Sequence, residues 1–376
     1  MKVLVTDGAN RVALAVVRAL GRTGAEVAVV EQERFAQKTP AAFRSRFVSR
    51  HDVLPTLGSD GAFLEALAER ASGYDVVLPV STNVALACAE ARDRIPARLP
   101  LPPIGVLRKA NDKSAALAMA RKVGVPIPVT YAPEDDEELE EVLARLKLPA
   151  VVKLRDDAGT VLDPGQRYAV GTTHDEVRQA FRALHAVKPF PLIQQKVLGP
   201  GFGVGVLAEK GRLLASVAHR RVREYPITGG PSTVCVSVVD ERLTGYAAAL
   251  IRELDWTGVA MVEFKKDDDY RLMEVNPRFW GSLPLATRSG VNFPQLLCRL
   301  AMGEAVGELP KAEAGVKLRF LPLDAAAALS ALRDPERRWA YSLGFLRDVF
   351  DPGVVDGILD PGDLDASLQY LANHLP

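Results

Sequence analysis

The stretch VAMVEFKKDDDYRLMEVNPR, residues 259–278, carries the strongest structural signal in this sequence of 376 residues. Two runs rich in apolar residues, Val259–Lys265 and Tyr270–Asn276, flank a turn of one lysine and three aspartates. Apolar runs on either side of a short polar turn are typical of two antiparallel strands. The stretch therefore predicts a β-hairpin.

The charged side chains of this hairpin gather on one face. The two-residue period of a strand puts Glu274, Asn276 and Arg278 on the same face, and Glu263, opposite Leu272 or Glu274, shares it in either register. Two carboxylates in an apolar hairpin repel each other and resist desolvation. Mg²⁺ prefers such oxygen ligands and leaves positions open for phosphate. Glu263 alone favours a solvated edge, but the whole set favours a metal site.

Length and charge limit the classes of protein to be considered. A chain of this length has room for two or three domains. With 48% hydrophobic and 25% charged residues, the composition is typical of a folded protein rather than of a disordered or collagen-like one. The 47 lysines and arginines balance the 47 aspartates and glutamates, which argues against nucleic acid and anionic membranes as partners.

Cysteine usage and hydropathy indicate the compartment. Cys88, Cys235 and Cys298 are far apart and form no CxxC pair, which predicts reduced thiols rather than disulfides or a zinc site. The apolar run after Lys2 is too short for a signal peptide, and no segment approaches the ~20 apolar residues of a membrane span. We therefore expect a cytoplasmic protein.

The first hundred residues alternate strand-like and helix-like patterns. Apolar runs at Lys2–Val5, Ala25–Val30 and Asp75–Val80, with helical spacing between them, predict a parallel sheet with crossover helices, the α/β class. The turn after the first run, Asp7–Ala13, lacks the GxGxxG pattern of dinucleotide-binding turns. We interpret this part as a scaffold domain rather than a nicotinamide-cofactor site, and the proline-rich Arg98–Pro103 marks its end.

From Ala150 onward the pattern changes to strands with short turns, which predicts a largely antiparallel α+β region. A helix capped by Asn111 and Asp112 and closed by Gly124 precedes it. Beyond Lys311 the sequence becomes alanine-rich and helical, with Asp-Pro-Gly turns further on. The expected strands are Ala150–Leu154, Leu192–Val197, Gly203–Ala208, Leu213–Val222, Thr233–Val239 and the two of the hairpin.

With an acidic residue on one strand and Glu274-Val275-Asn276-Pro277-Arg278 on the next, the hairpin resembles the metal motif of the ATP-grasp superfamily, an acidic residue followed by E-x-N-x-R. The resemblance covers about residues 1–305 and is to the branch with biotin carboxylase and the carbamoyl-phosphate synthase large chain. It implies a Rossmann-like domain (1–105), an ATP-grasp domain of two α+β lobes (106–310, lid lobe about 126–191) and a helical C-terminal extension (311–376).

The resemblance also implies how ATP and metal bind. Lys113 and Lys153 correspond to the two lysines that bind the ATP phosphates, a role that suits their compact charge. The expected adenine contacts are the side chain of Gln194 and the backbone of Gln195, Lys196 and Val197. The expected ligands of one or two Mg²⁺ ions, with Mn²⁺ as the alternative, are Glu263, Glu274 and Asn276.

Two positions depart from the family pattern. Gly201–Gly203 stands where the family often has a glutamate for the ribose. The lid loop, Arg155–Thr160, has a single glycine before Gly165, whereas the family usually has a glycine-rich loop there.

A run of basic residues, 219–223, falls where the family binds the carboxylate substrate and the transferred phosphate. Alternation separates Arg220 from Arg221, which shares a face with His219 and Arg223. We expect Arg220, and after it Arg223, to bind substrate, because guanidinium suits carboxylate and phosphate. Arg278 is expected to steady the acyl phosphate, and His219 is interpreted as a structural contact rather than a base.

The resemblance implies an ATP-dependent ligase that forms an acyl phosphate from a small carboxylate and passes the acyl group to an amine, or to a thiol, with release of ADP and phosphate. Bicarbonate activation and a nucleotide-binding sensor without ligase activity remain as alternatives. The expected partners are small-molecule carboxylate and amine substrates, and the C-terminal extension suits a packing or homodimer-forming element.

Overall fold

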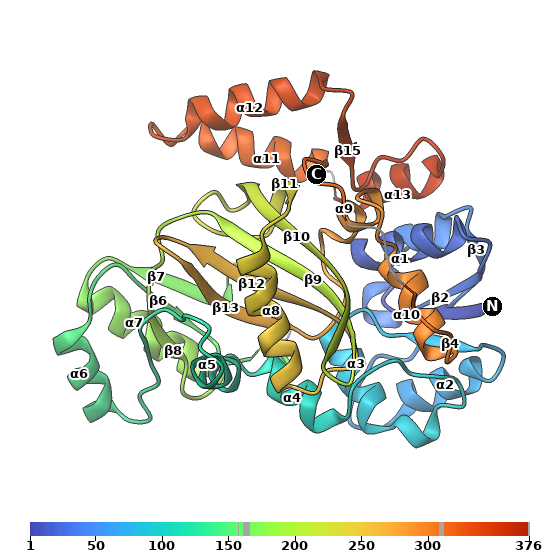
Figure 1. The fold of residues 1–376 in the computed structure, drawn as a ribbon, viewed down its shortest axis with the longest axis horizontal. Helices are drawn as coiled ribbons and strands as arrows, with labels where there is room; N and C mark the ends of the chain where they lie inside the picture. The colour runs from blue at the N-terminus through green and yellow to red at the C-terminus, as the bar shows by residue number, and fades with distance from the viewer. Residues whose placement is uncertain (157, 161–165, 308–311, 375–376) are drawn as a thin grey trace.

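The computed structural model describes residues 1–156, 158–160, 166–307 and 312–374, and Figure 1 shows their arrangement. A seven-stranded sheet occupies the centre, with the N-terminal sheet on one side of it and a smaller four-stranded sheet on the other. The C-terminal helices lie across one end of the central sheet. Asp157 and Gly165 of the expected lid loop, and Lys311, lie outside the described residues.

The N-terminal sheet is parallel throughout, with the strand order β3-β2-β1-β4. Its strands are β1 (Lys2–Val5), β2 (Glu26–Gln32), β3 (Val48–Leu54) and β4 (Val76–Leu78), and its helices are α1 (Arg11–Gly21), α2 (Ala62–Ala71) and α3 (Thr82–Glu90). The prediction of a parallel α/β sheet is confirmed. The strand β3 is absent from the apolar runs that predict the sheet, because the exposed polar residues of this strand hide the strand pattern.

The turn between β1 and α1 is filled by protein side chains. Glu31 accepts a hydrogen bond from the backbone N–H of Ala9 at 2.7 Å and another from that of Gln32 at 2.6 Å. Asp7 accepts hydrogen bonds from the backbone of Val80 and Ser81. Buried carboxylates thus accept hydrogen bonds from the backbone N–H groups around this turn.

The central sheet has the strand order β13-β12-β9-β10-β11-β14-β15 and is antiparallel except for the last pair. The strands predicted from the sequence in this region are confirmed, with ends that differ by a few residues. They are β9 (Gly201–Glu209), β10 (Arg212–Glu224), β11 (Ser232–Val238), β12 (Gly258–Lys266) and β13 (Tyr270–Asn276). The sheet also contains β14 (Lys317–Arg319) and β15 (Val354–Asp356), two short strands that the sequence did not predict.

Both faces of this sheet are covered. On one face α8 (Glu241–Glu253) packs with apolar residues of β9, β12 and β13, and Trp256 lies in the same core. On the other face α9 (Leu283–Arg288) and α10 (Phe293–Ala301) share a core with α1 and the N-terminal sheet. Because this core is continuous, the N-terminal sheet is held firmly against the central one.

The lobe that the sequence predicts as a lid, and that we call the lid for brevity, is a separate antiparallel sheet with its own core, in the order β5-β8-β6-β7. Its last strand in the chain ends at Gln195, so this lobe extends slightly beyond the expected 126–191. The lid contains β5 (Thr130–Tyr131), α6 (Asp136–Arg145), β6 (Ala150–Lys153), β7 (Tyr168–Gly171), α7 (His174–Val187) and β8 (Leu192–Gln195). The helices α4 (Ile104–Asn111) and α5 (Lys113–Lys122) lead into it.

The C-terminal extension is helical, as predicted, with α11 (Leu321–Ala331), α12 (Arg338–Phe350) and α13 (Leu364–His374). Each Asp-Pro-Gly step forms a turn in which the aspartate accepts a hydrogen bond from the glycine N–H, at 2.9 Å for Asp351 and 3.0 Å for Asp360. The helices α11 and α12 lie side by side, away from the N-terminal sheet (Figure 1).

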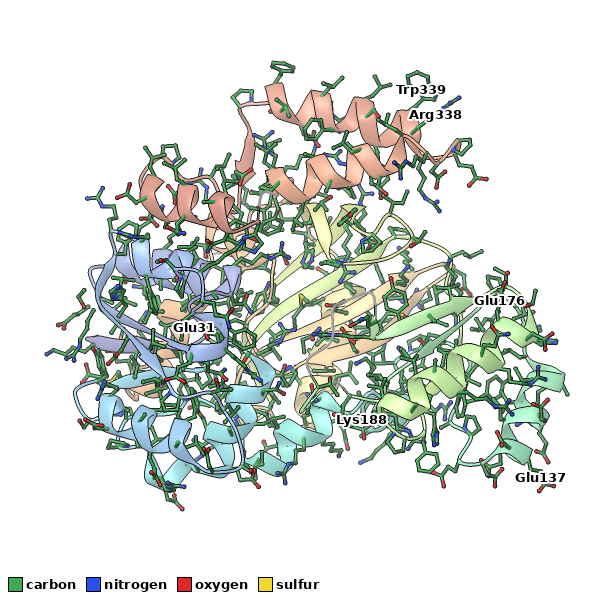
Figure 2. The ribbon with its side chains drawn as sticks, turned by 180° about the vertical axis from the view of Figure 1, so that it is seen from behind. Glu31, Glu137, Glu176, Lys188, Arg338 and Trp339 are labelled. Carbon is green, nitrogen blue, oxygen red and sulfur yellow. The ribbon has the colours of Figure 1, made fainter. Side chains whose placement is uncertain are left out.

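The outer surface of α12 is unusually apolar. Its exposed side chains include Trp339, Leu343, Leu346 and Phe350, and Figure 2 shows Trp339 beside Arg338 at the edge of the molecule. The three cysteines are buried and free. In the part of the chain that the structure describes, no helix combines the length and the apolar character needed to cross a membrane.

Candidate active site

The hairpin of β12 and β13 brings the predicted metal ligands together. Glu263 lies opposite Glu274, which settles the two registers that the sequence allowed. The side-chain amide of Asn276 donates hydrogen bonds to Oε1 of Glu263 at 3.0 Å and to Oε1 of Glu274 at 3.2 Å. The three oxygen-bearing side chains therefore converge on one point above the sheet.

Four cationic side chains surround these carboxylates. Lys113 Nζ lies 3.2 Å from Glu274 Oε2, and Lys153 Nζ donates to the carbonyl of Met273 at 3.3 Å. Arg221 forms an ion pair with Glu263, and Arg278 Nη2 lies 3.4 Å from Asn276 Oδ1. The charge cluster, as we call this group, consists of Glu263, Glu274, Asn276, Lys113, Lys153, Arg221 and Arg278.

The lysines reach the charge cluster from different elements. Lys113 is the first residue of α5, whose N-terminus is capped by Asp112 through the N–H of Ala115 at 3.0 Å. Its own backbone N–H donates to the carbonyl of Arg155 at 2.8 Å, which ties this helix to the start of the lid loop. Lys153 ends β6 in the lid sheet. The structure thus places a lid residue and a core residue on the same carboxylate hairpin.

The surroundings lower the pKa of one carboxylate of the hairpin and raise the pKa of the other. Burial would raise the pKa of Glu274, but Lys113 and Lys153 outweigh it and lower that pKa to about 2. Burial raises the pKa of Glu263, and the charge of Glu274 adds to this against the opposing pull of Arg221. Burial and the neighbouring Lys113 lower the pKa of Lys153 to about 8. Burial thus opposes the charged form of Glu263 in spite of its ion pair with Arg221.

The donor set fits a hard divalent cation. Two carboxylates and one amide oxygen are the ligands that Mg²⁺ uses with one face left open. The amide of Asn276 now turns its nitrogen toward both carboxylates, and a half-turn about its terminal bond would present Oδ1 to a cation instead. Within the described ranges no three His, Cys, Asp or Glu side chains form a metal-binding group, so the amide is needed as the third ligand.

Alternate glycines of β9 form a flat floor beside the charge cluster. A Cβ atom at Gly201 would lie 2.8 Å from Arg221 Cδ, one at Gly203 would lie 2.4 Å from His219 Cε1, and one at Gly205 would lie 2.1 Å from the ring of Trp280. Each of these large side chains therefore lies directly on the backbone. The stretch that departs from the family pattern at the ribose position belongs to this floor.

His219 is a neutral group in this arrangement. Burial, with a smaller effect of Arg221, lowers its pKa to about 3. Its Nε2 lies 3.3 Å from Ser282 Oγ. These contacts agree with the structural interpretation, because an imidazole of such low pKa is a poor proton acceptor.

The structure corrects the expectation about the arginines of β10. Arg220 pairs with Phe202 on the face covered by α8, and its side chain is exposed there, so Arg221 is the arginine that meets the carboxylates. A bulge follows Arg221, and Arg223 is buried in ion pairs with Asp324 and Asp348 of the C-terminal extension. Arg220 and Arg223 thus both lie outside the charge cluster.

In the strand expected to bind adenine, several polar groups form hydrogen bonds within the protein instead. The amide of Gln194 is buried and donates to Thr130 Oγ1 at 2.9 Å, which uses its N–H within the lid sheet. The backbone N–H groups of Gln195 and Lys196 donate to the carbonyls of Val129 and Pro149. Gln194 is therefore a lid-sheet contact here rather than a side chain free to meet a base.

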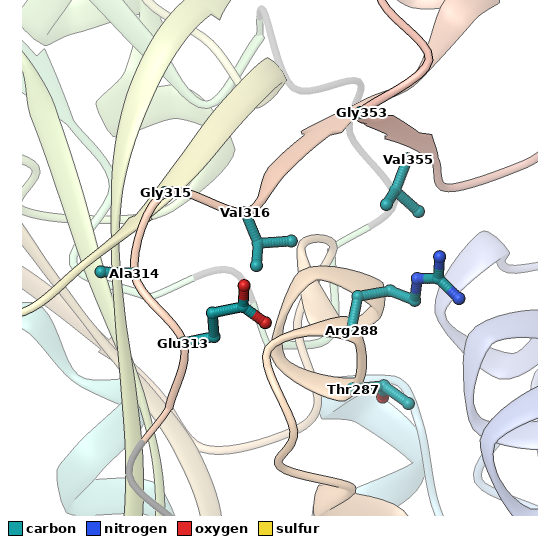
Figure 3. A pocket seen from close by; sticks show the side chains of 8 residues that line it. All are labelled: Thr287, Arg288, Glu313, Ala314, Gly315, Val316, Gly353 and Val355. Carbon is teal, nitrogen blue, oxygen red and sulfur yellow. The ribbon is translucent and has the colours of Figure 1, made fainter.

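A separate cavity lies at the C-terminal side of the molecule. It has a volume of about 470 Å³ and lies between the end of α9, the segment before β14 and the start of β15 (Figure 3). Figure 3 shows Arg288 and Glu313 among its lining side chains. None of its lining residues belongs to the charge cluster.

Comparison with known proteins agrees with this geometry. Residues 189–322 match a family model described as ATP-grasp in the biosynthetic pathway with Ter operon. The carbamoyl phosphate synthase large chain of Methanoregula boonei is 24% identical over 229 residues, which are 57% of this chain and 21% of that protein. The chain thus spans about a fifth of the length of this relative.

Solved structures share the fold. An N5-carboxyaminoimidazole ribonucleotide synthetase in its ADP complex superposes with a TM-score of 0.65 at 17% identity, over 84% of this chain and 80% of that one. The L-amino acid ligase of Bacillus licheniformis superposes with a TM-score of 0.62 at 19% identity, over 82% and 77%. The E-x-N-x-R hairpin, the family match over residues 189–322 and these shared folds thus all indicate similarity to the ATP-grasp superfamily.

Proposed function

We propose that the protein is an ATP-dependent ligase that activates a small carboxylate as an acyl phosphate and joins it to an amine or a thiol. The observation that carries this proposal is the charge cluster, in which two carboxylates and an amide converge among two lysines and two arginines. Fold alone does not require so many charges at one point, whereas phosphoryl transfer requires them. The names of the structural neighbours, an N5-carboxyaminoimidazole ribonucleotide synthetase and an L-amino acid ligase, support ligase chemistry.

We assign ATP binding to the region where Lys153 of the lid reaches the charge cluster on the central sheet. We assign the phosphates to Lys113 and Lys153, and the adenine to the backbone that follows β8 at Lys196 and Val197. In this proposal residues 1–105 are the Rossmann-like scaffold, 106–310 are the ATP-grasp domain and 311–376 are the extension. Tyr168 of the lid already donates a hydrogen bond to the carbonyl of Gly229, so the lid has a contact with the core that can hold it over bound nucleotide.

Glu263, Glu274 and Asn276 would hold one or two Mg²⁺ ions, which supply charge neutralisation for the phosphates when bound. A carboxylate oxygen of the substrate attacks the γ-phosphorus, and the bond to the β–γ bridging oxygen breaks with its electron pair leaving on ADP. Arg221 and Arg278 orient the substrate carboxylate and its acyl phosphate through charged hydrogen bonds.

In the second step the nucleophile attacks the acyl carbon. The carbon–oxygen bond to phosphate breaks, inorganic phosphate leaves with the electron pair, and the nucleophile gives up one proton. The neutral His219 and Ser282 lie over the glycine floor and supply polar contacts without a charge. Water must be excluded while the acyl phosphate exists, which is the task that we assign to the lid.

The extension provides a candidate dimer contact. Trp339, Leu343, Leu346 and Phe350 are exposed and spaced four, three and four residues apart, the pattern of a coiled-coil seam. We propose that two copies of α12 pair across a two-fold axis, and that the protein works in the cytoplasm, where its free cysteines stay reduced. Light scattering should show a dimer that Leu343→Asp converts to a monomer.

The test of the ligase proposal is release of ADP and phosphate with MgATP and a panel of carboxylates, including amino acids and bicarbonate, each with and without an amine. Release that depends on one carboxylate, with ligated product only in the presence of an amine, is expected. Release with bicarbonate alone would favour the carboxylating alternative. Tight ATP binding by calorimetry without turnover of any acid would favour a sensor, and no ATP binding would contradict the proposal altogether.

A further inference from the structure

The guanidinium of Arg11 has an aromatic contact but, within the described part of the chain, neither a hydrogen-bond acceptor nor a counter-charge. Arg11 is the first residue of α1, and its Cζ lies 4.2 Å from the centre of the Phe320 ring. Its Nη2 would lie 2.8 Å from a Cβ atom at Gly281, so the group presses flat against that backbone. Among the residues that the structure describes, none forms a hydrogen bond or an ion pair with it.

Arg18, on the same helix, is an arginine in which each guanidinium nitrogen has a hydrogen-bond acceptor. It lies seven residues, or about two helical turns, further on and therefore on the same side of α1. It donates to Asp363 Oδ2 at 2.8 Å, to the carbonyl of Ile358 at 2.9 Å, and to Ser367 Oγ at 3.0 Å. The guanidinium of Arg18 is thus hydrogen-bonded to the C-terminal extension, whereas no described residue accepts a hydrogen bond from the guanidinium of Arg11.

The guanidinium of Arg11 has no nearby carboxylate, among the described residues, to balance its charge. Burial lowers the pKa of Arg11, and the opposing effects come from Tyr370 and Cys235 rather than from a carboxylate. The side chain is half-buried, so the guanidinium keeps some contact with water. An anion that reaches it would supply the counter-charge that no described residue provides.

Arg11 is continuous with the candidate active site. Gly281, against which it lies, precedes Ser282, and Ser282 contacts the imidazole of His219. His219 in turn lies across Gly203, the residue paired with Glu263. A row of small and neutral groups thus joins the charge cluster to Arg11, with a cationic region at each end.

We propose that Arg11 binds a second anionic group of the carboxylate substrate, at the end remote from the carboxylate that is phosphorylated. This inference rests on the proposed ligase function and names its substrate class, a carboxylic acid that carries another carboxylate or a phosphate group. The planar guanidinium pairs with either group through two parallel hydrogen bonds. The positive end of the α1 dipole favours the same charge.

The test compares matched acids on the complete protein. Calorimetry in the presence of Mg²⁺ and a non-hydrolysable ATP analogue would measure binding of succinate and of 3-phosphonopropionate, each against butyrate, which lacks the second anion. The wild type is expected to prefer one dianion, and Arg11→Gln is expected to reduce that preference by about 10-fold or more. The choice between succinate and 3-phosphonopropionate identifies the anionic group.

Equal affinity of the wild type for dianions and butyrate, or an unchanged preference in Arg11→Gln, would overturn the inference. Binding of the ATP analogue is measured in the same experiment, and its absence in the wild type would instead count against the ligase proposal. The two failures are therefore distinguishable.

Thermal unfolding supplies a readout independent of ligand binding, with Arg18 as the matched control. Arg18→Gln is expected to lower the Tm by several degrees, because it leaves the buried Asp363 without the cation of its ion pair. Arg11→Gln is expected to leave the Tm unchanged or raise it. A loss of Tm in Arg11→Gln equal to that in Arg18→Gln would show that Arg11 is structural.

Discussion

Two buried ionic groups lie two residues apart on β10 and differ in completeness. Arg223 meets Asp324 and Asp348, whose side chains are 0% exposed, and Lys317 and Thr233 donate to the same carboxylates. Arg221 meets Glu263, but in the charge cluster the side chain of Glu274 is 29% exposed and an amide bridges the two carboxylates. The Arg223 group, which we call the closed group, is a complete structural contact. The Arg221 group in the charge cluster, which we call the open group, is arranged to take a ligand.

The largest effect is expected from removal of a carboxylate in the open group. Glu274→Ala should lower ATP turnover by about a thousand-fold, because the charge that holds the cation and orders Lys113 is lost. ADP release measures this, and circular dichroism should show an unchanged fold. The control is Asp268→Ala, which removes an exposed acid from the same hairpin. Near-normal turnover in Glu274→Ala would refute the metal assignment.

The opposite result is expected in the closed group. Asp324→Ala should lower the free energy of unfolding by about 3–5 kcal/mol, because Arg223 would stay buried with half of its partners. Urea titration measures the loss, and turnover per folded molecule should change little. A stable Asp324→Ala protein with poor turnover would erase the distinction between the two groups.

Neighbouring arginines on β10 test which face of the strand is functional. Arg221→Ala should lower kcat/KM for the carboxylate by about 100-fold, since it removes the ion pair with Glu263. Arg220→Ala should change it less than about 2-fold, because that side chain is exposed on the other face. Steady-state kinetics at saturating MgATP compare the two variants. A larger loss in Arg220→Ala would restore the prediction made from the sequence.

Glu31 is a third buried charge, intermediate between the two groups because its partners are backbone N–H groups. Burial raises its pKa from 4.5 to about 7. The folded protein therefore loses stability as the pH rises from about 4.5 to about 7, as the buried carboxyl ionises. Glu31→Gln should be more stable than the wild type by about 2 kcal/mol at pH 8 and not at pH 4. Equal pH profiles of urea unfolding would contradict this.

The strands were predictable because their apolar runs are local signals. The hairpin, its shared face and the antiparallel order follow from the residues between Val259 and Arg278. The choice between Arg220 and Arg221 was not predictable, since alternation separates them but does not say which face meets Glu263. That depends on the pairing of β9 with β12, which joins residues far apart in the sequence.

Other parts of the site depend on tertiary contacts alone. Arg223 follows a bulge, and its aspartate partners come from helices more than a hundred residues later. Gln194 has a polar partner in Thr130, which no spacing connects to it. Arg11 could have been suspected only as a cation at the start of a helix that lacks an acidic first turn. Its isolation becomes visible once Arg18 is seen beside the extension.

The glycine floor of β9 limits which residues can be changed to alter the choice of substrate. A surface made of backbone at Gly201, Gly203 and Gly205 has no side chain that evolution or a designer can exchange without displacing Arg221, His219 or Trp280. The positions of these three side chains beside the charge cluster are thus fixed by the backbone beneath them. New specificities have to come from residues outside β9, such as those at the start of α1 and in the segment after the hairpin. A change of substrate should therefore be sought first at those positions, with the glycines kept intact.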